Sequence, residues 1–296
     1  PTPPRVAFCG LGQMGAPMAA RLVDVSDLAV WNRTAERAAL LVEQGARPAA
    51  TPAEAAEGAG VVFTMLSNPD AVEEVVFGDH GVAAALGNGA TLVEMSTIGP
   101  AAVARIRDRL PPAAHLVDAP VLGSVPQATS GELKVFAGGE AADIDRVRPV
   151  LERLGTIRHV GALGAGAAMK LVANAILGVL MTGLGEALTL ADALGLDQHD
   201  VLDVLSESPI GVTTRSKRAN IESGTWPANF KLSLAAKDLG LVMDAATAAG
   251  LDVRLLPEAR AWLVAALDGP DGPDGPETAG LDYSVVIDTI RRSSGS

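Results

Sequence analysis

The 296-residue sequence has a single cysteine, few basic side chains and only four histidines. Cys9 has no partner for a disulfide and lies in an apolar run, which predicts a buried structural thiol in a reducing compartment. The net charge of −12 would repel nucleic acid or an anionic membrane. The histidines are scattered without ligand spacing, so we expect no metal.

The sequence also lacks a long uninterrupted hydrophobic run and a recognisable targeting signal. The apolar segment 162–196 is broken by Lys170, Asn174, Glu186 and Asp192, and no basic region precedes an apolar stretch at the N-terminus. Neither a GxSxG motif nor a Cys/His pair indicates acyl transfer. We therefore expect a cytoplasmic protein that does not span a membrane.

The hydrophobic fraction of 48% is enough for two cores. In residues 1–161, short apolar runs alternate with Ala-rich amphipathic stretches, which predicts an α/β domain with a parallel sheet. The expected strands are 6–9, 28–31, 61–66, 91–95, 115–119, 134–138 and 157–160. Residues 162–296 lose the strand signal and should form an all-α domain. The tripeptide DGP occurs three times in 268–276 and predicts a surface loop.

A glycine-rich turn follows the first expected strand and leads into a helical stretch. It reads GLGQMG and comprises Gly10, Leu11, Gly12, Gln13, Met14 and Gly15. In this context GxGxxG is typical of a dinucleotide site, where glycines allow a tight turn and close approach of the backbone to a pyrophosphate. The helix N-terminus would hold the diphosphate.

The end of the second expected strand discriminates between cofactors. A carboxylate there would bind the ribose 2′-hydroxyl of NAD, whereas a cation would accept the 2′-phosphate of NADP. The sequence has Asn32, Arg33 and Thr34 at this place, so NADP is favoured over NAD.

Two further loops follow expected strands, at the edge where open sheets bind ligands. Met65 and Leu66 offer apolar cover for a ring, and Ser96 and Thr97 offer hydroxyls. The second loop could equally serve as a helix N-cap.

Lys170 and Asn174 lie four residues apart in a long apolar helical stretch, so their side chains should be neighbours. An ammonium among apolar residues can have a lowered pKa that suits proton transfer. A lysine that extends to solvent is the alternative.

Six ordered motifs carry a resemblance to a known family. They are GLGQMGAPMAARL, WNRT, MSTIGP, DAPVLGSVPQATSGELKVFAGG, GxGxxxKxxxN at 164–174 and FKLSLAAKDLGL from Phe230. Together they resemble the β-hydroxyacid dehydrogenase family, which includes 3-hydroxyisobutyrate dehydrogenases and glyoxylate/succinic semialdehyde reductases. The resemblance implies an N-terminal Rossmann domain, a doubly wound parallel sheet, followed by a long helix and an all-α C-terminal domain. It also implies a homodimer or homotetramer that acts on a small molecule.

The resemblance implies a role for each matching residue. Lys170 would be the general acid/base, and Asn174 would hold the substrate oxygen or orient the lysine. Leu66, Ser67 and Thr97 would contact the cofactor at the nicotinamide ribose. Lys237 would also reach the cofactor, with Asp238 holding Lys237. Other substrate contacts would come from Ser96, Gly123, Ser124, Phe230 and Asp238.

Leu122 departs from the family pattern, because many relatives have serine there. The change removes a donor near the expected substrate carboxylate and predicts a substrate that is less carboxylate-like, larger or more apolar than 3-hydroxyisobutyrate. Arg215, Lys217 and Arg218 could meet an anionic substrate, although a solvated helix face is favoured.

Two alternatives remain. An imine reductase-like enzyme would share the fold and cofactor, but that group usually replaces the lysine. A non-catalytic NADP-binding oligomeric module would not need a proton donor. The 6-phosphogluconate dehydrogenases share the first half but have a longer helical domain.

Overall fold

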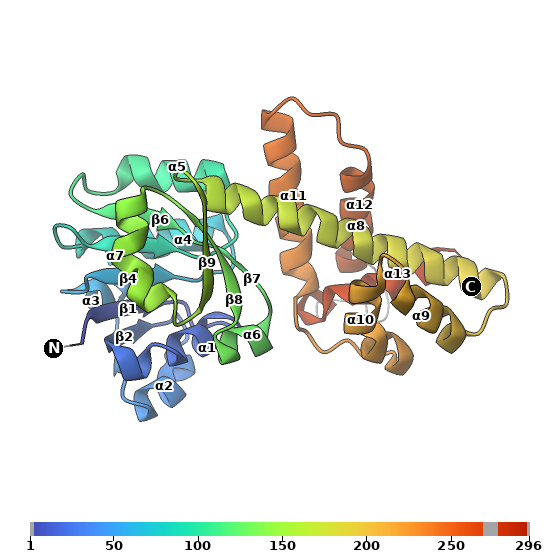
Figure 1. Ribbon diagram of the computed structural model, residues 1–296, viewed down its shortest axis with the longest axis horizontal. Coiled ribbons are helices and arrows are strands. Elements are labelled where there is room, and N and C mark those ends of the chain that lie inside the picture. Colours follow the sequence, from blue (N-terminus) through green and yellow to red (C-terminus); the bar gives the residue numbers. More distant parts are fainter. Residues whose placement is uncertain (1–2, 269–277, 295–296) are drawn as a thin grey trace. The chain divides into compact units, whose positions relative to one another are not determined.

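The computed structural model describes residues 3–268 and 278–294 (Figure 1). The chain forms two compact units, Pro1–Lys170 and Leu171–Ser296. The division falls inside the longest helix, α8, whereas we predicted a boundary at 161/162. The DGP segment lies outside the described residues except for Asp268, the last residue of α12.

The first unit is a mixed sheet with helices. Its strands are β1 (Arg5–Cys9), β2 (Asp27–Trp31), β3 (Arg47–Pro48), β4 (Val61–Thr64), β5 (Thr91–Glu94), β6 (His115–Asp118), β7 (Val121–Leu122), β8 (Leu133–Gly138) and β9 (Gly155–Gly161). Its helices are α1 (Gly15–Ala20), α2 (Ala39–Glu43), α3 (Pro52–Ala56), α4 (Pro69–Phe77), α5 (Pro100–Arg109), α6 (Val125–Ser130) and α7 (Ala141–Leu151).

The strand order is β3-β2-β1-β4-β5-β6-β8-β7, and β9 pairs with β8. The first six strands in that order are parallel, and β8 runs antiparallel to β6 and β7. The chain passes from β1 to β2 and β3 on one side and then returns to form β4 on the other side of β1. The switch point of the strand order therefore lies between β1 and β4, where doubly wound sheets bind ligands. The predicted Rossmann fold is confirmed.

Alternating strand residues build a core on each face of the sheet, as the two-residue period of a strand requires. Val6 and Phe8 pack into one core, whereas Ala7 and Cys9 pack into the other. Burial raises the pKa of Cys9 to about 12, which confirms the predicted buried thiol.

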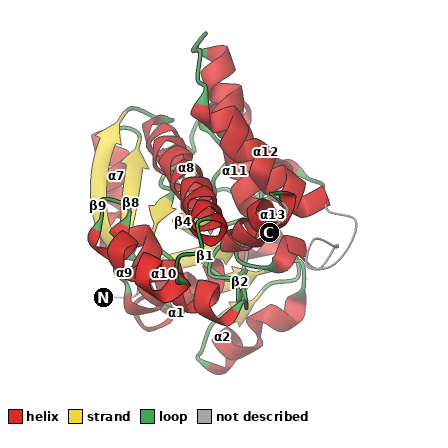
Figure 2. Ribbon diagram, turned by 90° about the vertical axis from the view of Figure 1, so that its right-hand side faces the viewer, coloured by secondary structure: helices red, strands yellow, loops and turns green. Residues whose placement is uncertain are grey.

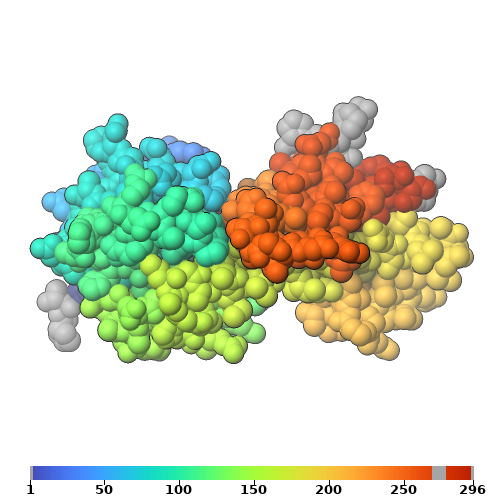
Figure 3. Space-filling view, turned by 90° about the horizontal axis from the view of Figure 1, so that it is seen from above, coloured from blue at the N-terminus to red at the C-terminus, as the bar shows by residue number. Residues whose placement is uncertain are grey.

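Every regular element among the described residues of the second unit is a helix, and Figure 2 shows yellow strands only in the first unit. Its helices are α8 (Ala165–Ala193, which starts in the first unit), α9 (Gln198–Glu207), α10 (Gly211–Ser223), α11 (Leu232–Ala248), α12 (Leu255–Asp268) and α13 (Val286–Ser293). Helices α11 and α12 pack side by side and form the orange surface in Figure 3.

Among the described helices, α8 alone is long and apolar enough to cross a membrane by length and composition. In the structure it contributes Leu171, Met181, Leu184 and Leu188 to the core of the second unit. A core helix of a globular domain has the same composition.

Candidate active site

The glycine-rich turn joins β1 to α1, and its three glycines face different surroundings. A Cβ on Gly15 would lie 1.9 Å from the Gly10 carbonyl oxygen, and one on Gly10 would lie 2.3 Å from the Met65 carbonyl oxygen. Gly10 also has φ +105°, which favours glycine. A Cβ on Gly12 would meet nothing within 4 Å. The turn is therefore closely packed on two sides and open at Gly12, which fits a pyrophosphate next to the backbone.

The side chain of Asn32, after β2, braces this turn. Its Oδ1 accepts a hydrogen bond from the Leu11 N–H (2.9 Å), and its Nδ2 donates to the Thr34 carbonyl (2.9 Å). Arg33 is exposed and makes no hydrogen bond or ion pair with any residue that the structure describes. Asn32 thus has a structural task, and Arg33 is a cation available to an anionic ligand.

The loops after β4 and β5 meet at a buried glutamate. Glu94 accepts hydrogen bonds from the Ser96 N–H (2.6 Å) and from the Thr64 hydroxyl, and the Ser96 hydroxyl accepts one from the Leu66 N–H (2.8 Å). Burial raises the pKa of Glu94 to about 7 against these hydrogen bonds, and the charge of Asp118 adds to the rise.

Asp118, at the end of β6, holds the start of α8. Its two carboxylate oxygens accept from the Gly164 N–H (2.8 Å) and the Ala167 N–H (2.6 Å), donors that a helix N-terminus leaves unpaired. Burial raises the pKa of Asp118, although these hydrogen bonds favour the charged form. Lys170 follows on α8 and is half-buried.

Neither Glu94 nor Asp118 was predicted as a functional residue. The available signal was a carboxylate at the end of an otherwise apolar strand, since acidic residues are seldom fully buried without partners.

The segment expected to bind substrate lies at the edge strand β7 and the start of α6. Leu122 is partly exposed. Gly123 has φ +142°, and a Cβ there would lie 2.7 Å from the Leu133 side chain. The N–H and hydroxyl of Ser124 both donate to Gln127 Oε1 (2.9 and 2.7 Å). A ligand would therefore compete with Gln127 for the Ser124 donors.

In the second unit, Asn174 on α8 and two residues of α11 form a polar cluster. Asn174 Nδ2 donates to Asp238 Oδ2 (2.5 Å), and Lys237 Nζ lies 2.7 Å from Asp238 Oδ1. Asn174 and Asp238 are buried. Together with Phe230 they line a small cavity, which Leu177, Gly178, Ala235, Leu239, Leu263 and Tyr283 complete.

The loop that carries Phe230 is held by a buried ion pair. Lys217 Nζ lies 2.7 Å from Asp282 Oδ1, and Asp282 Oδ2 accepts from the N–H groups of Asn229 and Phe230. Burial raises the pKa of Asp282, but Lys217 and the hydrogen bonds outweigh this and hold it below its usual range. The predicted solvated face is therefore wrong for Lys217, because its helix packs that side inward.

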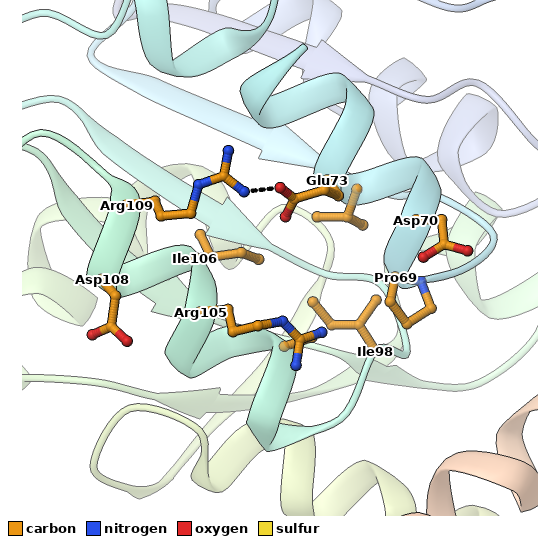
Figure 4. A pocket seen from close by; sticks show the side chains of 10 residues that line it. Pro69, Asp70, Glu73, Ile98, Arg105, Ile106, Asp108 and Arg109 are labelled. Atoms are coloured by element: carbon orange, nitrogen blue, oxygen red, sulfur yellow. Dashed lines mark ion pairs between the residues drawn. The ribbon is translucent and has the colours of Figure 1, made fainter.

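A groove of about 380 Å³ lies between α4 and α5 (Figure 4). Arg109 pairs with Glu73 across it, and Arg105, Asp70 and Asp108 add charges of both signs. None of the predicted site residues lines this groove. The described residues also include no cluster of three His, Cys, Asp or Glu that could hold a metal.

Comparisons with known proteins agree with this geometry. Residues 5–164 match the family described as the NAD binding domain of 6-phosphogluconate dehydrogenase. Residues 164–275 match the family described as "NAD-binding of NADP-dependent 3-hydroxyisobutyrate dehydrogenase". The chain belongs to the β-hydroxyacid dehydrogenase family.

Two relatives and one solved structure illustrate the likeness to this family. The 3-sulfolactaldehyde reductase of Escherichia coli K12 is 37% identical over 81% of this chain and 83% of its own length. The 3-hydroxyisobutyrate dehydrogenase of Pseudomonas aeruginosa is 36% identical over 80% and 84%. The Mycobacterium tuberculosis 3-hydroxyisobutyrate dehydrogenase, solved with L-serine, has a TM-score of 0.85 and 29% identity, covering 98% of this chain and 100% of its own. As a member of this family, the chain is an NAD(P)-dependent oxidoreductase.

Proposed function

We propose that the protein is an NADP-dependent reductase or dehydrogenase of a small carbonyl or hydroxy compound that bears an acidic group, with Lys170 as general acid/base. The observation that carries the proposal is the glycine turn. Gly10 and Gly15 are required by close packing, whereas Gly12 faces open space that a pyrophosphate can fill. When bound, the nicotinamide cofactor supplies or accepts the hydride.

The preference for NADP rests on the end of β2. No carboxylate is present there to bind a ribose 2′-hydroxyl, and Asn32 is already bonded to Leu11 and Thr34. Arg33 is exposed beside them and can form charge-assisted hydrogen bonds with a 2′-phosphate. The cofactor contacts are thus residues 10–15, Asn32, Arg33, Thr34, Met65, Leu66, Ser67, Thr97 and Lys237.

In the reductive direction, Lys170 donates a proton from Nζ to the substrate oxygen, and in the oxidative direction it accepts that proton. Asn174 lies one turn further along α8 and offers an amide to the same oxygen or to the lysine. The substrate contacts are Ser96, Leu122, Gly123, Ser124, Lys170, Asn174, Phe230 and Asp238.

By their names, the two relatives described above act on short acidic substrates. One substrate is an aldehyde that bears a sulfonate, and the other is a β-hydroxyacid. Leu122 offers an apolar contact where many family members offer a hydroxyl. We therefore propose a substrate that is larger or more apolar than 3-hydroxyisobutyrate. A cytoplasmic homodimer or homotetramer is part of the proposal, and exposed apolar residues of α8, such as Val172 and Ile176, support assembly.

The test is an assay of reduction with NADPH and with NADH against glyoxylate, succinic semialdehyde, 3-sulfolactaldehyde and cyclic imines. We expect NADPH to give the higher kcat/KM with an acidic aldehyde, and Arg33→Ala to narrow the difference between the cofactors. A preference for NADH would refute the NADP assignment, and turnover of imines alone would favour an imine reductase.

Lys170→Ala should lower kcat by roughly 10² to 10⁴, the usual contribution of general acid catalysis. Binding of NADPH, measured by fluorescence titration, should change little. Lys134→Ala, on strand β8, is a control that removes an exposed lysine of the first unit. Near-normal turnover after Lys170→Ala would exclude the mechanism and favour a non-catalytic NADP-binding module if NADPH still binds.

A further inference from the structure

Glu94 ties together the ends of two neighbouring strands. Glu94 and Thr64 are the last residue pair in the parallel register of β5 and β4. The Thr64 hydroxyl donates a hydrogen bond to Glu94 Oε2. Glu94 Oε1 turns forward and accepts from the Ser96 N–H. One carboxyl group thus fixes the end of β4 and the first turn of the loop after β5.

The connection continues through Ser96 to the loop after β4. The Ser96 hydroxyl accepts from the Leu66 N–H at 2.8 Å. Leu66 in turn packs against the glycine turn, because a Cβ on Gly10 would lie 2.8 Å from Leu66 Cδ2. The segments bound in this way are the loop after β4, the loop after β5 and, by packing, the glycine turn.

This arrangement is costly for the core. Glu94 is 1% exposed, and the structure gives it no cation partner. Asp118, opposite it on β6, is another carboxylate and adds repulsion. An apolar residue would avoid the cost of burying this carboxyl. The arrangement therefore indicates a role for Glu94 that packing alone does not supply.

We propose that Glu94 is a positioning residue for the nicotinamide half of the cofactor, acting through Thr64, Ser96 and Leu66. The inference rests on the proposed function, in which Leu66, Ser67 and Thr97 are cofactor contacts, and on the family resemblance, which implies that these three residues contact the nicotinamide ribose. The adenosine half is held elsewhere, by the glycine turn and the end of β2. Loss of Glu94 should therefore affect the two halves of the cofactor unequally.

The experiment compares two probes on the full chain, NADPH and adenosine 2′,5′-bisphosphate, by isothermal titration calorimetry. Glu94→Ala should weaken NADPH binding by roughly 10- to 100-fold, as expected for lost hydrogen bonds to an acidic group. Binding of adenosine 2′,5′-bisphosphate should stay within about twofold, because neither the glycine turn nor the end of β2, both described by the structure, makes a hydrogen bond with Glu94.

Glu94→Gln should restore most of the NADPH affinity, because an amide oxygen can accept from the Ser96 N–H and the amide nitrogen can donate to the Thr64 hydroxyl. Thr91→Val is the matched control. Thr91 is buried at the other end of the same strand, and its hydroxyl has no hydrogen-bond partner within the described residues. This variant should bind both probes as the wild type does.

Equal weakening of both probes in Glu94→Ala, or of neither, would overturn the role of Glu94. If Glu94→Ala does not fold, Ser96→Ala removes the hydrogen bonds that the Ser96 hydroxyl makes with Leu66 and Glu94, and it should show the same unequal effect on the two probes. Equal effects there would also overturn the role. A wild type that binds neither NADPH nor NADH would instead refute the proposed function. A wild type that prefers NADH would refute only the NADP assignment, and the comparison would then use NADH and AMP.

Discussion

Both units bury carboxylates beside predicted site residues, but they stabilise them differently. In the first unit, Glu94 and Asp118 accept hydrogen bonds from neutral N–H and O–H groups, and burial raises the pKa of both. In the second unit, Asp282 is paired with Lys217, and its pKa is held low. Neutral donors can bond to either protonation state of an acid, whereas an ion pair requires the charge. The two units should therefore differ in their response to mutation and to pH.

The largest effect is expected where the charge is required. Lys217→Met keeps an unbranched chain of similar length but leaves Asp282 buried without its cation. We expect the free energy of unfolding at pH 7 to fall by about 3 to 5 kcal/mol, measured by urea titration. Since Asp282 has a lowered pKa in the wild type, the difference in stability should shrink as the pH falls from 3.8, the ordinary value, through that lowered pKa, because the wild-type carboxyl then takes up a proton and the ion pair is lost.

The matched control is Arg218→Met on the same helix, α10. Arg218 pairs with Asp203 and Glu222 at the surface, where water screens the charges. Its replacement should cost much less than that of Lys217. Equal losses in the two variants would contradict the special role of the buried pair.

The first unit should respond to pH in the opposite direction. The pKa of Glu94 is raised from 4.5 to about 7 in the folded protein. Its contribution to stability is therefore fully present below pH 4.5 and is lost as the pH rises to about 7. Glu94→Gln removes this titration. The variant should gain up to about 3 kcal/mol relative to the wild type between pH 4.5 and 8.

Urea titrations at several pH values give this difference in the free energy of unfolding directly. The contributions of the other acidic residues are the same in the two proteins and cancel. Glu36→Gln removes an exposed negative charge from the same unit and serves as the control. Parallel stability curves for the wild type and Glu94→Gln would show that Glu94 does not titrate in this range.

The sequence predicted most of the fold because local patterns carry it. All seven expected strands are present, since each stretch has four residues or more and includes β-branched, leucine or aromatic residues. The two missed strands, β3 and β7, have two residues each, too few to show a period. The glycine turn was predicted for the same reason: its geometry depends on residues adjacent in the chain.

The polar connections could not be predicted, because their partners are far apart in the sequence. Lys217 and Asp282 are separated by 65 positions, and Asp118 and Ala167 by 49. Only the strand register places Thr64 opposite Glu94. The sequence pattern identifies a polar residue that would be costly to bury, but it does not identify the hydrogen-bond donor that offsets the cost of burial.

The smallest effect is expected at Asp118, the other buried acid of the first unit. Asp118→Asn leaves one oxygen to accept from the Gly164 or the Ala167 N–H, and the amide nitrogen faces the other donor. The free energy of unfolding should fall by about 1 to 2 kcal/mol, as for the loss of a helix cap. The kcat should also fall, because the affected turn begins the helix that carries Lys170.

Thr51→Ala is the control that separates the loss of stability from the loss of kcat. Thr51 caps α3 by accepting from the Glu54 N–H, so its loss should destabilise the same unit by a similar amount without changing kcat. A lower kcat in both variants would assign the effect to stability, and an unchanged kcat in both would show that the start of α8 does not position Lys170. A lower kcat in Asp118→Asn alone, with NADPH affinity retained, would assign different roles to the two acids. Glu94 would position the cofactor, and Asp118 would position the helix that carries the proton donor.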